Sequence, residues 1–304
     1  METPDMEMAN LDSAQTKVCE TALPESTSSS RPRPHTEDDL RHIMRCALAE
    51  LRGLERNAKT LPEVLTEHVE SSRPHFAFSA ADVEWMMARA TAWQADRDEQ
   101  RRRDGHRHFA EAVGPRFAAA TLESYRVVCI EQRKALDALL AYRDNIKERA
   151  AAGAGIIMFG VAGSGKTHLL VGMGEAAIDA GFDVKWRNGV DLAAEFRSTI
   201  SGRRSEDDDE GVTEEDVVTD LASAEILILD DVLPPSGTLS EYQSGNLYRI
   251  LNRRYNDCRP TWASMNVASG EEAERGAGCQ NIDRLRHGAL TLFCGWESYR
   301  KAQG

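Results

Sequence analysis

Apolar residues recur at helical spacing in the first third of the chain and form short continuous runs further on. Leucine, isoleucine, methionine and alanine three or four positions apart predict an amphipathic helix that begins at Thr36, where Asp39 completes an acidic variant of the capping box. A second helix is predicted from Ser79, because Asp82 stands in the same relation to it. Together with Leu61 to Val69, these helices indicate a small α-helical module.

From residue 109 the pattern changes to apolar runs of strand length that alternate with helical segments. The expected strands are Ile156 to Phe159, Phe182 to Trp186, Ile226 to Leu229, Pro260 to Val267 and Leu290 to Phe293. The expected helices are 130–150, 166–180, 192–200, 213–221, 239–256 and 282–286. Strands that alternate with helices predict an α/β fold, in which a parallel sheet is flanked by helices.

These patterns divide the chain into three predicted segments. Residues 1–35 are polar and are expected to be a disordered tail, 36–108 form the helical module, and 109–304 form the α/β domain. The basic run Arg101 to His108 is interpreted as a solvated linker or helix end, with a phosphate contact as the alternative. For the helical module, a purely structural hairpin and a partner-docking role remain equally open.

The composition narrows the class of protein. Charged residues make up 29% and hydrophobic residues 41% of the 304 residues, as in a soluble globular protein. No apolar stretch has the length of a membrane span and no secretory signal is visible, so we expect a cytoplasmic protein with no membrane partner. The scattered cysteines include no C-x-x-C pair, which predicts reduced thiols rather than a zinc site or a disulfide framework. The net charge of −13 argues against a broad basic surface for nucleic acid but leaves room for a local basic patch.

The strongest chemical signal is the sequence GVAGSGKT at residues 160–167. It follows a predicted strand and opens a predicted helix, the setting in which a glycine-rich loop and a helix N-terminus cradle the phosphates of ATP. Lys166 would reach the β- and γ-phosphates, and the Thr167 hydroxyl would hold Mg²⁺. The expected nucleotide-binding residues are Gly160, Val161, Ala162, Gly163, Ser164, Gly165, Lys166, Thr167 and His168.

A second signal is the acidic pair in the sequence AEILILDDV at residues 224–232. Ligands bind at the carboxyl ends of strands in open α/β sheets, so Asp230 is expected to hold the Mg²⁺ shell and Asp231 to position the attacking water. Asn266 follows another strand and could orient that water, although an Asn in this position is more often a turn former. Arg284 lies on a short predicted helix and is by default a solvated charge.

The order of these elements resembles an AAA+ ATPase, and further motifs resemble the DnaC-type replicative helicase loaders and the related IstB-type transposition helpers. Those motifs are PRF at 115–117, ATLESYR at 120–126, TEED at 213–216, LSEY at 239–242, RPT at 259–261 and DRLR at 283–286. The closing WESYR at 296–300 favours the loader branch. The resemblance covers about residues 113 to 300.

The resemblance implies roles that the residues alone do not give. Asn266 would be the sensor I residue, and Arg284 would be an arginine finger that reaches the nucleotide of a neighbouring subunit. Arg300 would stand in for sensor II, since the family lacks the C-terminal helical lid. The family also implies a homo-oligomer joined through its ATP sites, single-stranded DNA as a ligand, and an N-terminal module that docks on the DnaB-type replicative DNA helicase. The basic residues expected near DNA are Arg197, Arg203 and Arg204.

We therefore predict a helicase loader that binds and hydrolyses Mg·ATP. Turnover is expected to be slow and stimulated by a partner, because Asp231 has a shorter side chain than the Glu usual in the superfamily. Two alternatives remain. One is an IstB-type helper that acts on duplex DNA with a transposase, and the other is a nucleotide-gated scaffold with negligible turnover.

Overall fold

The computed structural model describes residues 33–54, 59–202 and 212–299 of the chain. These residues divide into two compact units that meet between Arg101 and Arg102. Almost all of the predicted N-terminal tail lies outside the described residues. In the described ranges, no helix combines the length and the apolar character that crossing a lipid bilayer requires.

The first unit consists of helices that begin at capped positions. Its elements are α2 (Glu37–Gly53), α3 (Leu61–Ser72), the first part of α4 (Ala80–Val113), and the two-residue parallel strands β1 (Arg33–Pro34) and β2 (Phe76–Ala77). The capping box predicted at Thr36 is confirmed, because the Thr36 side chain accepts a hydrogen bond from Asp39 N while the Asp39 carboxylate accepts one from Thr36 N. The apolar faces of these helices enclose a cluster that includes Ile43, Leu65 and Met86.

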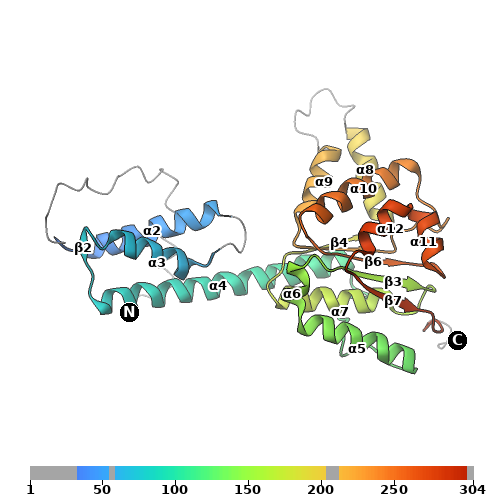
Figure 1. The fold of residues 1–304 in the computed structure, drawn as a ribbon, viewed down its shortest axis with the longest axis horizontal. Coiled ribbons are helices and arrows are strands. Elements are labelled where there is room, and N and C mark those ends of the chain that lie inside the picture. The colour runs from blue at the N-terminus through green and yellow to red at the C-terminus, as the bar shows by residue number, and fades with distance from the viewer. Residues whose placement is uncertain (1–32, 55–58, 203–211, 300–304) are drawn as a thin grey trace. The chain divides into compact units, whose positions relative to one another are not determined.

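The second unit is a five-stranded parallel sheet in the order β4-β5-β6-β3-β7 (Figure 1). Its strands are β3 (Ile156–Gly160), β4 (Val184–Asn188), β5 (Ile226–Asp230), β6 (Thr261–Met265) and β7 (Leu290–Cys294). Its helices are α5 (Ile130–Asp144), α6 (Ile146–Ala151), α7 (Lys166–Asp179), α8 (Gly189–Gly202), α9 (Glu214–Ser223), α10 (Glu241–Asn256), α11 (Gly270–Ala277) and α12 (Cys279–Arg286). The predicted parallel α/β architecture is confirmed.

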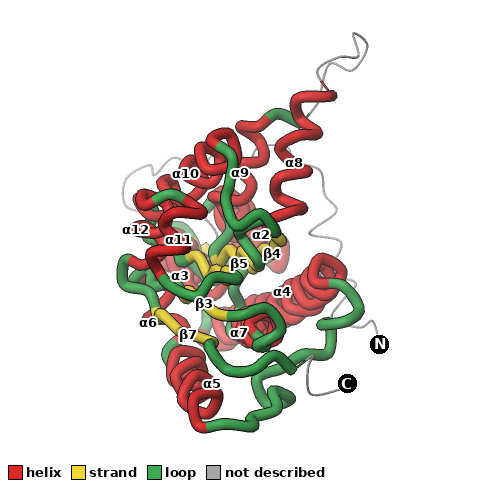
Figure 2. Tube along the Cα trace, turned by 90° about the vertical axis from the view of Figure 1, so that its right-hand side faces the viewer, coloured by secondary structure: helices red, strands yellow, loops and turns green. Residues whose placement is uncertain are grey.

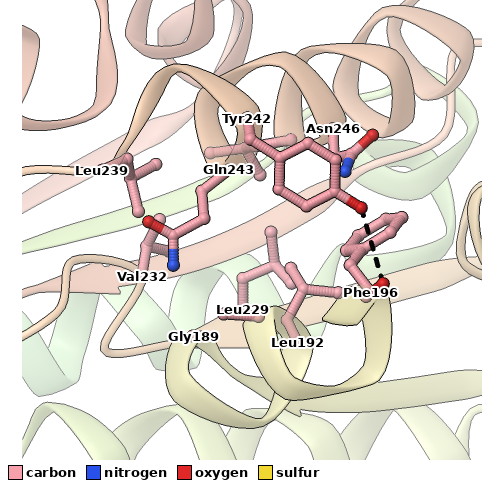
Figure 3. Close-up of a pocket in the computed structure, with 11 residues that line it drawn as sticks. Gly189, Leu192, Phe196, Leu229, Val232, Leu239, Tyr242, Gln243 and Asn246 are labelled. Carbon is pink, nitrogen blue, oxygen red and sulfur yellow. Dashed lines mark hydrogen bonds between the residues drawn. The ribbon is translucent and has the colours of Figure 1, made fainter. Parts of the chain in front are cut away.

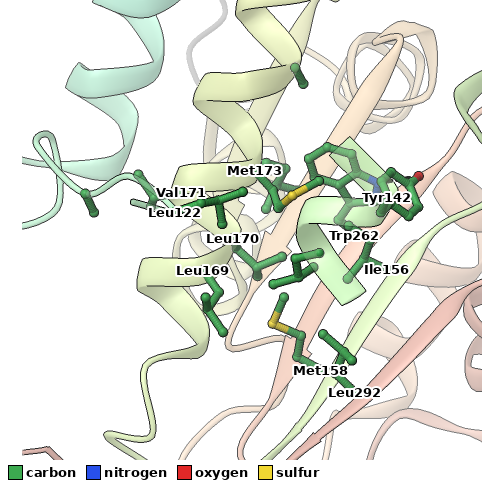
Figure 4. Close-up of a cluster of buried hydrophobic side chains, with 14 of the residues drawn as sticks. Leu122, Tyr142, Ile156, Met158, Leu169, Leu170, Val171, Met173, Trp262 and Leu292 are labelled. Atoms are coloured by element: carbon green, nitrogen blue, oxygen red, sulfur yellow. Dashed lines mark hydrogen bonds between the residues drawn. The ribbon is translucent and has the colours of Figure 1, made fainter. Parts of the chain in front are cut away.

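Helices cover both faces of this sheet, with α5 and α7 on one face and α8 to α12 on the other (Figure 2). Successive side chains of a strand point to opposite faces. In β3, Ile156 and Met158 therefore join the cluster around α7, which Figure 4 shows, while Ile157 and Phe159 join the cluster under α8 to α12. Both faces of the central strands are buried, as their continuous apolar sequences indicate.

Helix α4 corrects the interpretation of the basic run as a linker or helix end, because the helix continues through that run. Gly105 does not interrupt it. A Cβ atom at this position would lie 3.1 Å from Ile178 Cγ2 of α7, so glycine permits the close approach of the two helices. The neighbouring His106 lies between the carboxylates of Glu175 and Asp179 of α7. Tertiary packing on α7 thus keeps this polar segment helical.

Two helical segments of the second unit also differ from the predictions. The single helix expected over 130–150 is two helices, because the backbone leaves the helical region at Asn145 (φ −121°, ψ 28°). Helix α11 has no predicted counterpart, since the segment has only eight residues and contains two glycines. One sequence signal for α11 exists, because its N-cap Ser269 accepts a hydrogen bond from Glu272 N.

Arg254 of α10 holds the amino ends of two strands together. It is buried, and no carboxylate in the described part of the chain pairs with it. Burial lowers the pKa of Arg254 to about 9. Carbonyl groups at the end of a helix carry partial negative charge, so dipoles stabilise this cation. Its guanidinium donates to Thr261 Oγ1 and to the carbonyl oxygens of Leu221, Ala222, Ala224, Glu225 and Pro260.

Replacement of Arg254 by methionine should lower the free energy of unfolding by about 3–5 kcal/mol, because it leaves these carbonyl groups buried without a donor. Arg253→Ala is the matched control, since Arg253 lies on the surface of the same helix and pairs with Glu215. The control should cost at most about 1 kcal/mol. Urea unfolding of both variants measures the difference, and equal losses would contradict this role of Arg254.

Candidate nucleotide-binding site

The loop between β3 and α7 depends on glycine at its turning points. Gly163 (φ 81°) and Gly165 (φ 95°) lie in the left-handed region, and Gly165 is the N-cap of α7. Gly160 ends β3, and a Cβ atom there would lie 2.2 Å from Cys294 O of β7. The loop therefore packs tightly against the last strand and leads directly into the N-terminus of a helix, where unpaired N–H groups favour anions.

Lys166 supplies the cation of this loop. The residue is only 4% exposed, and its ammonium group donates to Gly160 O at 3.0 Å and to Val161 O at 2.9 Å. A third hydrogen bond runs to Asn266 Oδ1 at 2.8 Å. These three acceptors are neutral, so the contacts exchange at low cost for the charged oxygens of a phosphate group.

Asp230 ends β5 beside the loop and is held by two hydroxyl groups. Thr167 Oγ1 donates to one carboxylate oxygen at 2.8 Å, and Ser264 Oγ donates to the other at 2.6 Å. Burial raises the pKa of the Asp230 carboxyl, and the negative charge of Asp231 adds to the rise. The two hydroxyl donors and the charge of Lys166 oppose it. The result is a buried carboxyl group for which a bound cation would be favourable.

Asp231 takes a backbone conformation that is uncommon for a residue with a side chain. Its φ of 46° lies in the left-handed region, and its N–H donates to Ser264 Oγ at 2.9 Å. The carboxylate accepts a hydrogen bond from Asn266 Nδ2 at 2.7 Å. A Cβ atom at Gly189 would lie 2.4 Å from Asp231 O, so α8 can begin at this point only with glycine. Asn266 thus contacts both Lys166 and Asp231.

A pocket of about 290 Å³ opens from this cluster toward the segment before α5. Its polar end contains Lys166, Thr167, Asp231 and Asn266. The other end of the pocket is lined by residues that the sequence analysis did not identify as site residues. An arginine next to an aromatic residue, in RF at 116–117 and YR at 125–126, is the sequence signal that could have indicated them. These wall residues are Arg116, Phe117, Ser124, Tyr125, Arg126 and Tyr299.

Two tyrosines fasten this wall to the loop. Tyr125 Oη donates to Ser164 O at 3.2 Å, and Tyr299 N donates to Gly163 O at 3.0 Å. Their rings meet edge to face with centroids 5.9 Å apart. An aromatic wall beside a phosphate cradle suits the base and ribose of a nucleotide.

The predicted site residues fall into three groups. The glycine-rich loop, Asp230, Asp231 and Asn266 come together, and His168 also lines the pocket, with its Nε2 2.9 Å from Thr121 O. Arg284 does not line this pocket, because it lies at the end of α12. Arg197 is on α8, away from the pocket lining. Arg203, Arg204 and Arg300 lie outside the described residues.

A second pocket lies between α8 and α10 and is mainly apolar, unlike the P-loop pocket (Figure 3). Its lining includes Leu229 and Val232, which flank the acidic pair. Tyr242 Oη donates to Phe196 O at 3.5 Å across it. Its volume of about 30 Å³ is close to that of one water molecule, so it offers no room for a nucleotide.

Comparisons with known proteins agree with this site. Residues 54–304 match the family model described as IstB-like ATP binding protein. The chain is 29% identical over 186 residues to the replicative helicase loader DnaC of Buchnera aphidicola subsp. Acyrthosiphon pisum (strain APS), which covers 61% of this chain and 71% of that protein. It is also 29% identical over 235 residues to a putative insertion sequence ATP-binding protein of Sinorhizobium fredii, which covers 75% of this chain and 73% of that protein.

A solved structure shares the fold. The crystal structure of the DnaC helicase loader superposes with a TM-score of 0.50 at 22% identity, and the match covers 59% of this chain and 99% of that chain. The predicted resemblance to DnaC- and IstB-type AAA+ ATPases is confirmed. The chain belongs to the IstB-like ATP-binding proteins, a family of P-loop ATPases with the AAA+ fold.

Proposed function

We propose that this protein is an ATP-dependent loader of a replicative DNA helicase. The observation that carries the proposal is that hydrogen bonds link the P-loop residue Lys166 to Asn266, and Asn266 to Asp231. The relatives of this protein include DnaC helicase loaders. ATP would bind with its phosphates on the loop from Gly160 to Thr167 and its base against the aromatic wall. Single-stranded DNA and the helicase are the proposed partners, with the first compact unit as the docking module.

The residues around Asp230 fit a magnesium ion that arrives with the nucleotide. A hydroxyl and a carboxylate are the hard oxygen donors that Mg²⁺ prefers, and Thr167 and Asp230 supply them at hydrogen-bond distance from each other. The described residues contain no group of three or more His, Cys, Asp or Glu side chains able to hold a metal alone. Phosphate oxygens would therefore be part of the coordination shell. When bound, the ion would neutralise charge on the phosphates.

Hydrolysis would depend on the hydrogen-bonded side chains of Lys166, Asn266 and Asp231. Asp231 would accept a hydrogen bond from the attacking water, and the Asn266 amide would hold that carboxylate in place. Lys166 would exchange its carbonyl acceptors for phosphate oxygens. The short side chain of Asp231 supports slow turnover that a partner stimulates.

Arg284 would act on the nucleotide of a neighbouring subunit. It lies outside the pocket that contains its own P-loop, so it cannot serve the nucleotide bound to the same chain without a large rearrangement. Its guanidinium is positioned by Asn252 Oδ1 at 3.0 Å and by Tyr248 Oη at 2.9 Å. ATP binding would then favour a homo-oligomer and act as the switch for the helicase.

A transposition helper acting on duplex DNA is the second candidate. The relative from Sinorhizobium, named as an insertion sequence ATP-binding protein, aligns over a larger share of this chain than the Buchnera loader does. Both candidates use the same ATP site, so the partner and the form of DNA distinguish them.

Asp230→Asn should raise the melting temperature of the nucleotide-free protein and abolish Mg²⁺-dependent ATP hydrolysis. The pKa of Asp230 is raised in the folded state, so its ionised form costs stability above that pKa, and an amide removes this cost. A gain of about 1 kcal/mol corresponds to about 2–4 °C in a protein of this size. The gain should shrink as the pH falls through the raised folded-state pKa toward the ordinary value of about 4, because the folded protein then takes up a proton on this carboxyl group. Thermal unfolding at pH 8 and pH 4 tests this, with Asp137→Asn on the exposed face of α5 as the control.

Arg284→Ala should leave ATP binding to the isolated chain intact and lower hydrolysis in the assembled state by a factor on the order of 10³. Arg286→Ala is the control, because Arg286 lies on the same helix and is bound to Glu274. Nucleotide affinity from a fluorescent ATP analogue and turnover at high protein concentration separate binding from catalysis. Normal turnover by the assembled Arg284 variant would show that the finger assignment is wrong.

Co-elution with the host's replicative helicase on a sizing column, with and without Mg·ATP, tests the proposed function itself. We expect a complex that Lys166→Ala weakens, because this change removes the cation that binds the phosphates. Deletion of residues 1–101 should abolish the complex while retaining ATP binding, since it leaves the second compact unit whole. Failure to form a complex under every nucleotide condition, together with binding to duplex DNA, would favour the transposition helper.

A further inference from the structure

Ser264 of β6 contacts the acidic pair through both its side chain and its backbone. Its hydroxyl group donates to Asp230 Oδ1 at 2.6 Å and accepts a hydrogen bond from Asp231 N at 2.9 Å. Its carbonyl oxygen accepts another from Val232 N at 3.0 Å. One residue of β6 therefore binds three consecutive residues where β5 ends.

The register of the sheet places Ser264 at this position. Strands β5 and β6 are parallel, with Leu229 beside Ala263, so Asp230 and Ser264 are the next residues along the two strands. Side chains two residues apart on a strand point to the same face of a sheet. The Trp262 side chain belongs to the cluster around α7, so Ser264 points toward α7 as well. Ser264 is fully buried, and its hydroxyl group meets the acidic pair rather than solvent.

A hydroxyl group is suited to the two side-chain contacts of Ser264. The Asp230 carboxylate needs a donor and the Asp231 N–H needs an acceptor, and a serine hydroxyl offers one O–H donor together with two lone pairs. An alanine at position 264 would provide neither. A single oxygen atom thus links the side chain of one acidic residue to the backbone of the next.

The same contact holds Asp231 in its uncommon backbone conformation. A residue with a side chain seldom adopts a φ of 46°, and the surrounding structure must keep it there. Ser264 holds the N–H of Asp231, while α8 packs closely on its carbonyl oxygen, to which a Cβ atom at Gly189 would lie only 2.4 Å away. With the backbone held on both sides, the Asp231 carboxylate meets Asn266 Nδ2 at 2.7 Å.

We propose that Ser264 is a positioning residue for ATP hydrolysis, which fixes the Asp230 carboxylate and the Asp231 backbone relative to each other. The inference rests on the proposed hydrolysis of Mg·ATP and adds to it a residue that acts only through the two acids. A hydroxyl group that merely stabilised the fold would affect the free energy of unfolding and leave turnover by the folded protein unchanged.

Ser264→Ala tests the proposal by separating turnover from binding. The kcat for ATP should fall roughly 10- to 100-fold, as expected when a group that orients a metal-binding carboxylate is lost. The affinity for a fluorescent, non-hydrolysable ATP analogue in EDTA should stay at the wild-type value, because the P-loop is intact. The gain in that affinity on adding Mg²⁺ should become smaller, because Asp230 is no longer held in one orientation.

Thr199→Ala is the matched control for the loss of a buried hydroxyl group. Thr199 is 5% exposed, donates to Phe196 O at 2.8 Å and does not line the P-loop pocket. This variant should lose stability but keep the wild-type kcat and the wild-type response to Mg²⁺.

A pair of substitutions distinguishes the hydroxyl group from the volume of the side chain. Ser264→Thr keeps the hydroxyl group, while Ser264→Val has nearly the same shape as threonine without it. Turnover by the threonine variant should stay near the wild-type value, and turnover by the valine variant should fall as it does for alanine. Equal turnover by the threonine and valine variants would overturn the inference.

Hydrogen exchange at the Asp231 amide gives a readout without nucleotide. NMR of the nucleotide-free protein should show faster exchange of this amide in Ser264→Ala and Ser264→Val, because its N–H has lost its acceptor. Exchange in Ser264→Thr should remain slow. An Asp231 amide that exchanges at the wild-type rate in the alanine variant would contradict the positioning role.

The outcomes separate this inference from the proposed function. Wild-type protein that binds nucleotide but never hydrolyses it, alone or with a partner, overturns the proposed hydrolysis and the inference with it. Wild-type turnover by folded Ser264→Ala, or an equal loss in Thr199→Ala, overturns the inference alone. If Ser264→Ala does not fold, Ser264→Cys replaces it, because a thiol is a weak donor and acceptor of similar size. Wild-type turnover by the cysteine variant would then overturn the inference.

Discussion

Buried charged side chains at the carboxyl ends of β3, β5 and β6 have little contact with water, so they need hydrogen-bond partners from the protein. The surrounding elements provide those partners. The Lys166 ammonium and the Asp230 carboxylate are both almost fully buried. Lys166 is bound by loop carbonyls and by Asn266, while Asp230 is bound by hydroxyl groups. Because an isolated buried charge is costly, each donor and acceptor must come from a fixed place on a rigid element. The strand order β5-β6-β3 places these groups next to one another.

The opposite end of the sheet also contains a buried charge, but there carbonyl groups stabilise it. Arg254 is buried there without a carboxylate, and the carbonyl groups at the end of α9 and the start of β5 stabilise its charge. The carbonyl dipoles reduce the free-energy cost of burying the Arg254 guanidinium, but they do not cancel its positive charge. The two ends of the domain therefore differ in what they attract. At one end Lys166 lies beside two carboxylates, and at the other a pocket is lined by arginines and by no Asp or Glu among the described residues.

The ATP site itself does not distinguish a helicase loader from a transposition helper. Relatives from both groups align with this chain at 29% identity. The same fold and the same kind of nucleotide site can serve either partner, because function depends on the surfaces that are added to a fold. The difference must lie in surfaces that contact the partner, and we propose that the first compact unit provides one of them.

The sequence by itself determined the features whose causes are local. Capping at Thr36, the glycine-rich loop and the apolar strands are set by neighbouring residues, so they could be predicted, and so could the convergence of Lys166 and Asp230 at one sheet edge. Only the tertiary structure decided where α4 ends, since packing of Gly105 on α7 preserves a helix that its composition does not specify. It also decided the walls of the two large pockets. Tyr125 and Tyr299 are far apart in the chain yet meet at the loop. Arg259, after α10, and Arg284, on α12, line one pocket. Such contacts depend on strand order and helix packing, which no short stretch of sequence contains.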